Sequence, residues 1–209
     1  MTFAGFPETA LDFYDDLEMD NTKSFWAAHK HVYDTAVAAP MEALLSALEP
    51  QFGRAKVFRP YRDVRFAKDK TPYKNHQGGF CANGESSGWY IQVDARGVQV
   101  SAGTYATSPQ TRAALREAVD SARGAHLQRL LDDLGRAGWS VEGDRLKTHP
   151  RGCPPDHPRL ALMRHNSLWV TFDYGFEPVV HSPDLLDRVR ADWESTRPLV
   201  DWLGDATRV

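Results

Sequence analysis

Apolar residues recur at intervals of three and four along the first fifty positions of the chain, which is the period of amphipathic helices. Three helices are predicted there. The first opens at Pro7, and the second is capped by Asn21. The third restarts at Pro40 and is ended by Pro50 and Gly53. The apolar faces of these helices are formed by Ala10, Tyr14 and Leu17, by Phe25, His29, Val32 and Ala36, and by Met41, Leu44, Leu45 and Leu48.

The period then changes to two, which is typical of β-strands. Residues 89–93 and 98–102 alternate between apolar and polar side chains, with a short polar turn between them. They are therefore predicted to pair as an antiparallel hairpin. Residues 79–82 precede the turn dipeptide Asn83-Gly84 and predict a third strand of the same sheet. Residues 168–174 alternate in the same way and predict a further strand.

Helical and irregular segments lie between these strands. Residues 109–137 are predicted to be helical, with a break near Gly124. Residues 139–147 are predicted to form a pair of strands, and the Pro- and Gly-rich residues 148–158 are predicted to form a loop. Asp156 is the expected cap of a short helix that follows this loop.

A long helix is predicted at the end of the chain. Ser182 begins its cap, and Pro198 is expected to kink it, because the proline ring removes a backbone donor and clashes one turn back. Trp193 belongs to the apolar stripe of this helix, whereas Trp202 is expected to be partly exposed.

Helices followed by consecutive strands with short turns predict an α+β fold rather than alternating β-α-β units. The expected architecture has N-terminal helices, an antiparallel β-sheet covered by helices, and a long C-terminal helix. The 209 residues are within the range of one domain, so residues 1–209 are predicted to form a single domain.

Composition is that of a soluble globular protein. Apolar residues make up 42% of the chain, which is enough to form a core without a disulfide or a metal. Cys81 and Cys153 are expected to be free thiols. The N-terminus lacks the features of a signal peptide, and no apolar run approaches the ~18 residues of a membrane span. A cytoplasmic protein without membrane contact is therefore expected.

Charge is distributed unevenly along the chain. The net charge is −3, but residues 54–76 hold eight Lys or Arg against two Asp, so this segment is +6 and the rest is −9. A basic island on an acidic background favours a local anion-binding site. The acidic balance argues against a dedicated nucleic-acid-binding protein, and leaves weak nucleic-acid binding as the third hypothesis.

The basic motif, residues 59–74, contains the side chains best suited to bind an anion. Arginine offers a planar fork of donors that matches phosphate or carboxylate. The candidate residues are Arg59, Arg62 and Arg65 to hold the anion, Asp63 and Asp69 to orient them or act as a base, Lys70 to neutralise charge, Tyr73 to donate a hydrogen bond, and His76 as a neighbouring acid–base group. The leading hypothesis is a site for a phosphorylated or carboxylated small molecule, with catalysis undecided.

The same residue types also fit a structural role. Asp63 stands beside Arg62 and close to Arg65, so the motif suits an internal network of ion pairs that pins a long loop to the sheet. The second hypothesis is therefore a structural or partner-binding protein. The oligomeric state does not follow from the sequence.

The pattern Arg-x-x-Arg-Asp-x-Arg-Phe-x-x-Asp-Lys-x-x-Tyr, which runs from Arg59 to Tyr73, resembles the signature of a bacterial family catalogued as domain of unknown function 2461. The opening Phe-Pro and the segment Pro150-Arg151-Gly152 also resemble that family, and the similarity covers nearly the whole chain. The resemblance implies a widely distributed soluble protein spanned by one domain. It implies no particular activity.

Two other patterns resemble functional motifs. Residues 84–88 have the Gly-x-Ser-x-Gly spacing of a nucleophile elbow, but the strand pattern that follows predicts a hairpin turn instead. Residue types that bind zinc gather in the Pro-rich loop, at His149, Cys153, Asp156 and His157. Prolines interrupt this segment and prevent a shared helical face, so no metal and no cofactor are predicted.

Overall fold

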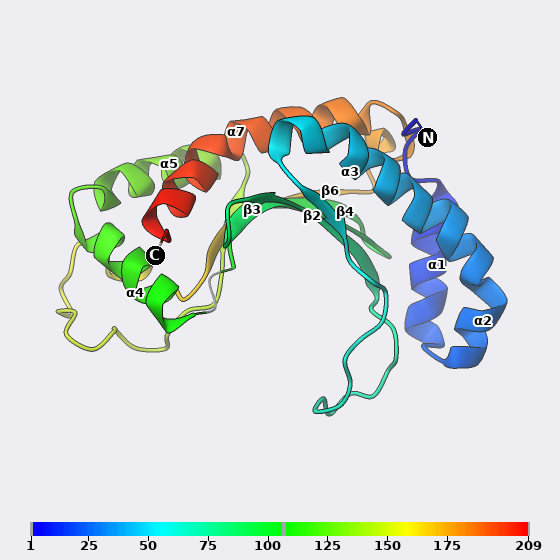
Figure 1. The fold of residues 1–209 in the computed structure, drawn as a ribbon, viewed down its shortest axis with the longest axis horizontal. Coiled ribbons are helices and arrows are strands. Elements are labelled where there is room, and N and C mark those ends of the chain that lie inside the picture. The colour runs from blue at the N-terminus through cyan, green and yellow to red at the C-terminus, as the bar shows by residue number, and fades with distance from the viewer. Residues whose placement is uncertain (1, 106–107, 209) are drawn as a thin grey trace. The chain divides into compact units, whose positions relative to one another are not determined.

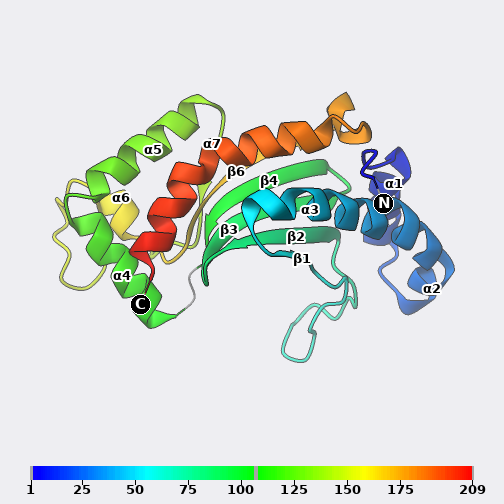
Figure 2. The ribbon, with the colours of Figure 1, turned by 45° about the horizontal axis from the view of Figure 1, so that its top comes forward.

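The computed structural model describes residues 2–105 and 108–208 (Figures 1 and 2). The helical elements are α1 (Glu8–Met19), α2 (Lys23–Val32), the π-helical η1 (Tyr33–Ala38), α3 (Ala39–Phe52), α4 (Pro109–Asp120), α5 (Gly124–Arg136), α6 (Leu160–Met163), the 3-10 turn η2 (Pro178–His181) and α7 (Leu185–Ala206). The strands are β1 (Ala55–Val57), β2 (His76–Asn83), β3 (Ser87–Asp94), β4 (Gly97–Thr104), β5 (Ser140–Glu142) and β6 (Leu168–Gly175).

Within the described residues, six antiparallel strands form one sheet in the order β1-β2-β3-β4-β6-β5. β3 and β4 are central and are joined by Ala95 and Arg96 alone, which confirms the predicted hairpin. β2 lies beside β3, as the turn at Asn83-Gly84 predicts. The α+β fold, with N-terminal helices and a long C-terminal helix, is confirmed.

Alternation along the strands separates a buried face of the sheet from a more open one. In β3, Trp89, Ile91 and Val93 are fully buried, whereas Tyr90 and Gln92 between them are half-buried. The apolar positions therefore face the core, and the polar positions of the same strand are available for other contacts.

The chain folds into two compact units. The first contains the residues up to Cys81 together with Tyr90–Val100 and Asp173–Ala191. The second contains Ala82–Trp89, Ser101–Phe172 and Asp192–Val209. The long strands β2, β3, β4 and β6 thus contribute residues to both units, as does α7.

In the first unit, α3 packs on one face of the sheet. Gly79 of β2 lies so close to this helix that an added Cβ atom would come within 2.3 Å of Leu45 Cδ1. α3 ends at Phe52 with Gly53 as its C-cap, which confirms the predicted end at Gly53, but Pro50 lies inside the helix and does not end it. Gly53 then terminates the helix, with a positive φ of 87°.

The N-cap of α2 is Thr22, and the prediction of Asn21 was wrong by one residue. Thr22 Oγ1 accepts a hydrogen bond from the backbone N–H of Phe25 at 3.2 Å. Both residue types are good caps, so the sequence pattern alone does not separate them. Asn21 is instead engaged with the basic motif.

In the second unit, the predicted strand pair within residues 139–147 is wrong. β5 pairs with β6, with Val141 opposite Val170, and Arg145 forms an isolated bridge with His165. The short helix α6 begins after Arg159, so Asp156 does not cap it. The intervening Pro158 disfavours helical backbone at the residue before it, which delays the start of the helix.

α7 has 22 residues and contains Pro198 in its interior. Trp193 is fully buried, as predicted, but Trp202 is also buried, at 7% exposure. The guanidinium of Arg123 lies 5.3 Å from the centre of the Trp202 ring and covers it, a tertiary contact that helical periodicity does not reveal. None of the described helices combines the length and the apolar character needed to cross a membrane.

We expect residues 1–209 to unfold in one cooperative transition, because four strands contribute residues to both compact units. Far-UV circular dichroism and tryptophan fluorescence, followed through a guanidinium titration, should give coincident curves. Two separated transitions would contradict the single-domain prediction.

Candidate functional site

The basic motif extends the hairpin of β1 and β2 beyond the sheet (Figure 1). Backbone hydrogen bonds continue past the strands, from Phe58 N to Gly78 O (3.0 Å), from Arg62 N to Pro72 O (2.9 Å) and from Lys74 N to Pro60 O (2.8 Å). Tyr61 and Tyr73 form an antiparallel bridge between these bonds. Pro60 and Pro72 contribute their carbonyl groups as acceptors to these bonds. The N–H group that proline lacks is therefore not needed for them. The motif is therefore an ordered projection.

Asn21 and Trp26 anchor the base of the motif. Asn21 Nδ2 donates to the carbonyl of Tyr73 at 3.0 Å, and Asn21 Oδ1 accepts from the N–H of Tyr73 at 3.1 Å. The same amide also donates to Asn75 Oδ1 at 3.0 Å. The ring of Tyr73 stacks on Trp26, with centroids 4.1 Å apart and planes 6° from parallel. Tyr73 is 6% exposed, so its ring belongs to the anchor.

Arg62 is held inside the motif. Its Nη1 atom donates to Asp69 Oδ2 and to Thr71 Oγ1. The N–H of Thr71 donates to Asp69 Oδ1 at 2.9 Å, and Thr71 Oγ1 donates to Asp69 Oδ2 at 3.0 Å. These bonds from Thr71 and Arg62 lower the pKa of Asp69 to about 2. The carboxylate of Asp69 is therefore fully ionised at neutral pH and occupied by its own loop.

Arg65 and Lys70 also bind partners within the motif. Arg65 forms a two-pronged ion pair with Asp63, at 2.9 Å from Nε to Oδ1 and 2.6 Å from Nη2 to Oδ2. This hydrogen bonding lowers the pKa of Asp63. Lys70 Nζ donates to the carbonyl of Val64 at 2.9 Å. The predicted orienting acids thus neutralise two of the three predicted arginines.

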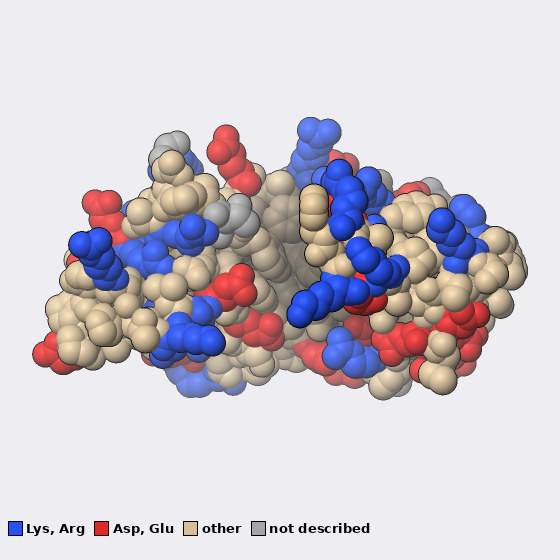
Figure 3. Space-filling view, turned by 90° about the horizontal axis from the view of Figure 1, so that it is seen from below, with Lys and Arg blue, Asp and Glu red and all other residues tan. Residues whose placement is uncertain are grey.

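Five other cations of this region form no ion pair with a carboxylate among the described residues. Three of them, Lys56, Arg59 and Lys74, we call the cationic cluster. Lys56 Nζ and Lys74 Nζ lie 5.6 Å and 5.5 Å from the centre of the Phe58 ring. Burial and the charge of Arg59 lower the pKa of Lys74, so these two cations lie close together. Figure 3 shows Lys and Arg side chains gathered where the motif projects toward the viewer.

His76 and Tyr90 lie beside the cationic cluster on the open face of the sheet. A Cβ atom added to Gly78 would come within 2.4 Å of the Tyr90 hydroxyl, so Tyr90 crosses over β2 there. His76 is two residues from Gly78 in the same strand and faces the same side. Burial and the charge of Lys74 lower the pKa of His76, so its half-buried ring is neutral at pH 7.

A chain of hydrogen bonds continues from Tyr90 along β3. The Tyr90 hydroxyl donates to Gln92 Oε1 at 3.0 Å, and Gln92 Nε2 donates to Asp94 Oδ2 at 2.8 Å. Arg96 closes the chain, with its Nη2 atom donating to Asp94 Oδ2 at 3.1 Å. The face next to the cationic cluster is therefore polar, with side chains held in fixed positions.

The family model for a conserved hypothetical protein, DUF2461, matches residues 9–202, a region that contains the whole site. The chain belongs to the DUF2461 family. Comparisons with curated proteins and with solved structures give no match.

In this DUF2461 protein, the predicted site residues fall into two sets. The first set serves the structure of the motif: Arg62, Asp63, Arg65, Asp69 and Lys70 bind one another or its backbone, and Tyr73 belongs to the anchor at its base. Arg59 and His76 lie instead with Lys56 and Lys74, two cations of the same basic segment that were not named as candidates. The sequence pattern did not indicate the other residues beside them, which are Phe58, Tyr90, Gln92 and Asp94. For Tyr90 and Gln92, a signal was present in the sequence: they alternate with the apolar residues of the predicted strand and so belong to its more open face.

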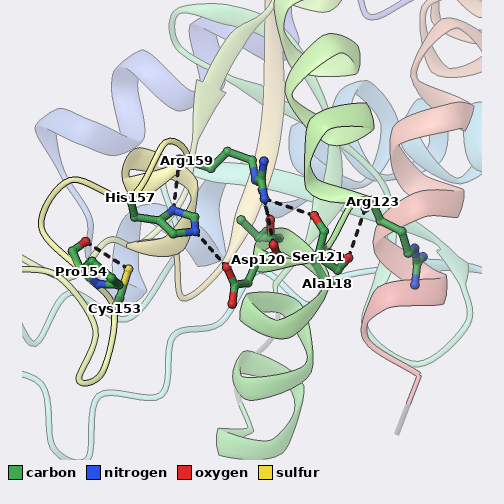
Figure 4. Close-up of polar contacts among 9 residues, drawn as sticks. Ala118, Asp120, Ser121, Arg123, Cys153, Pro154, His157 and Arg159 are labelled. Atoms are coloured by element: carbon green, nitrogen blue, oxygen red, sulfur yellow. Dashed lines mark hydrogen bonds and ion pairs between the residues drawn. The ribbon is translucent and has the colours of Figure 1, made fainter.

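His157 and Cys153 of the Pro-rich loop of the DUF2461 protein have structural contacts (Figure 4). His157 Nδ1 accepts from the N–H of Arg159 at 3.1 Å, and His157 Nε2 lies 2.9 Å from Asp120 Oδ1. Arg159 binds backbone carbonyls at the end of α4, including that of Val119 at 2.7 Å. Cys153 Sγ donates to the carbonyl of Pro154 at 3.6 Å. In residues 2–105 and 108–208, no group of three His, Cys, Asp or Glu could hold a metal ion.

Residues 84–88, with the spacing of a nucleophile elbow, comprise the turn between β2 and β3 and the first two residues of β3. The segment is a strand-to-strand turn, as predicted, and lacks the helix that such an elbow needs. Ser86 Oγ lies 2.9 Å from Thr207 Oγ1, and Ser87 Oγ donates to the carbonyl of Asn83 at 2.6 Å. Both hydroxyls serve the local structure.

Proposed function

We propose that this protein binds a phosphorylated or carboxylated small molecule at the cationic cluster. The observation that carries the proposal is that Lys56, Arg59 and Lys74 have no carboxylate partner among the described residues, although the acids of the motif are close by. None of the three forms an ion pair with a carboxylate among the described residues, and Lys74 is partly withdrawn from water. An anion at this position would remove the mutual repulsion that lowers the pKa of Lys74.

The surroundings of the cluster support a binding site that is formed in advance. The bonds of Asn21 and the stacking of Tyr73 on Trp26 fix the base of the motif, so little ordering is needed when a ligand binds. Arg59 supplies a planar fork of donors. The neutral ring of His76 can accept a hydrogen bond from a hydroxyl group of the ligand or from a singly protonated phosphate.

A second candidate function rests on a different observation. Arg62, Asp69 and Thr71 form a closed set of hydrogen bonds, and Arg65 pairs with Asp63. These contacts shape the projecting loop and involve no ligand. They fit a structural or partner-binding protein in which the basic motif is an ordered projection. The two functions predict different outcomes for the same titration.

We expect inorganic phosphate or succinate to stabilise the wild-type protein in a saturable way. A ligand at about 100 times its dissociation constant adds roughly 2.7 kcal/mol to the free energy of unfolding. For a chain of this length, the melting temperature should rise by roughly 5–10 °C. Arg59→Ala and Lys74→Ala should remove the saturable shift and leave the linear effect that excluded salts exert on any protein. Differential scanning calorimetry at constant ionic strength measures both components.

Arg54→Ala is the matched control, because Arg54 is an exposed cation of the same segment outside the cluster. It should leave the saturable shift unchanged. Histidine NMR adds a direct readout: bound phosphate should raise the pKa of His76, since an anion favours the imidazolium form. A purely linear response in the wild-type protein, with the pKa of His76 unmoved by phosphate, would refute anion binding and favour the structural function.

A further inference from the structure

Phe66 is the most exposed large apolar side chain among the described residues, at 97% exposure. It lies at the outer end of the basic motif, between Arg65 and the exposed Lys68. The backbone around it is ordered by the ion pair of Arg65 with Asp63 and by the hydrogen bond from Lys70 to Val64. The motif therefore holds an aromatic ring in water beside Lys68, and we call this segment the tip (residues 65–68). Neither the anion site nor the core uses this ring.

A second surface of the first unit has the opposite character. It is a depression of about 650 Å³, lined by Glu8, Leu11, Asp12, Asp15, Phe176 and Pro178, among others. We call it the acidic depression. Glu8, Asp12 and Asp15 recur at i, i+4 and i+7, so they share one side of α1. The apolar part of the lining includes Phe176, which is 66% exposed.

The acids of this depression have no cationic partner in the part of the chain that the structure describes. Likewise, Lys68 at the tip has no carboxylate partner among the described residues. One surface thus offers an aromatic ring with free positive charge, and the other offers apolar side chains with free negative charge. Complementary charge of this kind guides association and fixes which surfaces meet.

We propose that the tip of one copy of this chain docks in the acidic depression of a second copy. Phe66 would lie against Leu11 and Phe176, and Lys68 would approach the carboxylates of α1. In a two-fold dimer, each copy supplies one tip and one depression, so the contact forms twice. The contact is small, which predicts weak and reversible association. The proposal is independent of the anion site, because Phe66 is outside the cationic cluster.

Sedimentation equilibrium of the full chain over a wide concentration range tests the proposal. We expect reversible self-association that weakens as salt rises from low to physiological concentration. Phe66→Ser should raise the dissociation constant about tenfold to a hundredfold, as expected for losing the burial of one aromatic side chain. Tyr105→Ser is the control, because Tyr105 is 38% exposed and outside both surfaces, and it should have no effect.

Charge reversal tests the pairing of the two surfaces. Lys68→Glu and Asp12→Lys should each weaken association, and the double variant should recover it, because the attraction is restored with exchanged signs. A chain that stays monomeric at all concentrations would overturn the proposal. So would association that Phe66→Ser leaves unchanged, or a monomer whose Phe66 is required to bind phosphatidylserine vesicles, since the tip would then insert into a membrane surface.

Discussion

Gly97→Ala is expected to destabilise the protein by more than about 4 kcal/mol, and the variant should accumulate poorly as soluble protein. Gly97 follows the turn of the central hairpin and has a φ of 114°. A Cβ atom at this position would lie 1.8 Å from the carbonyl oxygen of Gly175 and 2.3 Å from its carbonyl carbon. Both atoms belong to the backbone, so no side-chain rotation can relieve the overlap. The free energy of unfolding from urea denaturation measures the effect.

Gly84→Ala is the matched control. Gly84 also has a positive φ, of 84°, but nothing lies within 4 Å of an added Cβ atom. Only the backbone strain of the left-handed region applies, which costs roughly 1–2 kcal/mol. The difference between the two variants isolates the close approach of Gly97 to Gly175. Equal stability of the two variants would show that these segments do not approach each other as described.

The central hairpin illustrates what the sequence could predict. Residues 89–93 and 98–102 alternate so regularly that only one face of each strand can be apolar, which fixes both strand type and pairing. The same reasoning predicted β2, from residues 79–82 before their turn, and β6, from residues 168–174. Local pattern predicts these elements because the apolar alternation and the turn residues lie within the segment itself.

Elements that depend on distant partners were harder to predict. Residues 139–147 have a strand-like composition, but β5 pairs with β6, which is distant in sequence. Trp202 is buried because Arg123 covers its ring, again through a long-range contact. Asn21 was taken for a helix cap on its residue type, whereas its amide binds the backbone of Tyr73, more than fifty residues away. None of these partners can be identified from spacing within one segment.

The candidate site shows the same division. The basic motif and its positive charge are evident from residues 54–76 of the sequence. The sequence does not show which of these cations form ion pairs with the acids of the motif. Arg62 and Arg65 have the same chemistry as Arg59, and only the conformation of the loop places carboxylates beside the first two. An arginine that is already paired has less capacity to bind a ligand. The structure therefore moves the proposed anion site from the middle of the motif to its base.

This division makes the two candidate functions separable by mutation. Arg62→Ala breaks a contact within the loop, whereas Arg59→Ala removes a cation that has no carboxylate partner among the described residues. Under the anion-binding proposal, Arg59→Ala removes the ligand response and leaves the loop intact. Under the structural alternative, Arg62→Ala has the larger effect, because it leaves Asp69 without its ion pair.

Trp89→Ala should lower the free energy of unfolding by about 3–5 kcal/mol, through the loss of a large core side chain and the cavity that remains. Trp89 is 1% exposed, and its Nε1 atom donates to the carbonyl of Trp193 and to Thr196 Oγ1, both at 3.0 Å. Its ring stacks on Trp193, with centroids 6.4 Å apart. Trp169→Ala is the control: Trp169 is half-buried on the other face of the sheet, so the same substitution should cost about 1 kcal/mol.

The Trp89→Ala variant also tests the single-domain prediction, because Trp89, Trp193 and Thr196 all belong to the second unit. If residues 1–209 unfold cooperatively, the whole transition moves to lower temperature by roughly 6–20 °C, including the part that reports on the first unit, which contains the proposed phosphate site. Phosphate should then raise the melting temperature of the variant by as much as that of the wild-type protein. A variant in which one transition falls while the phosphate-sensitive transition stays in place would show that the two compact units are separate domains.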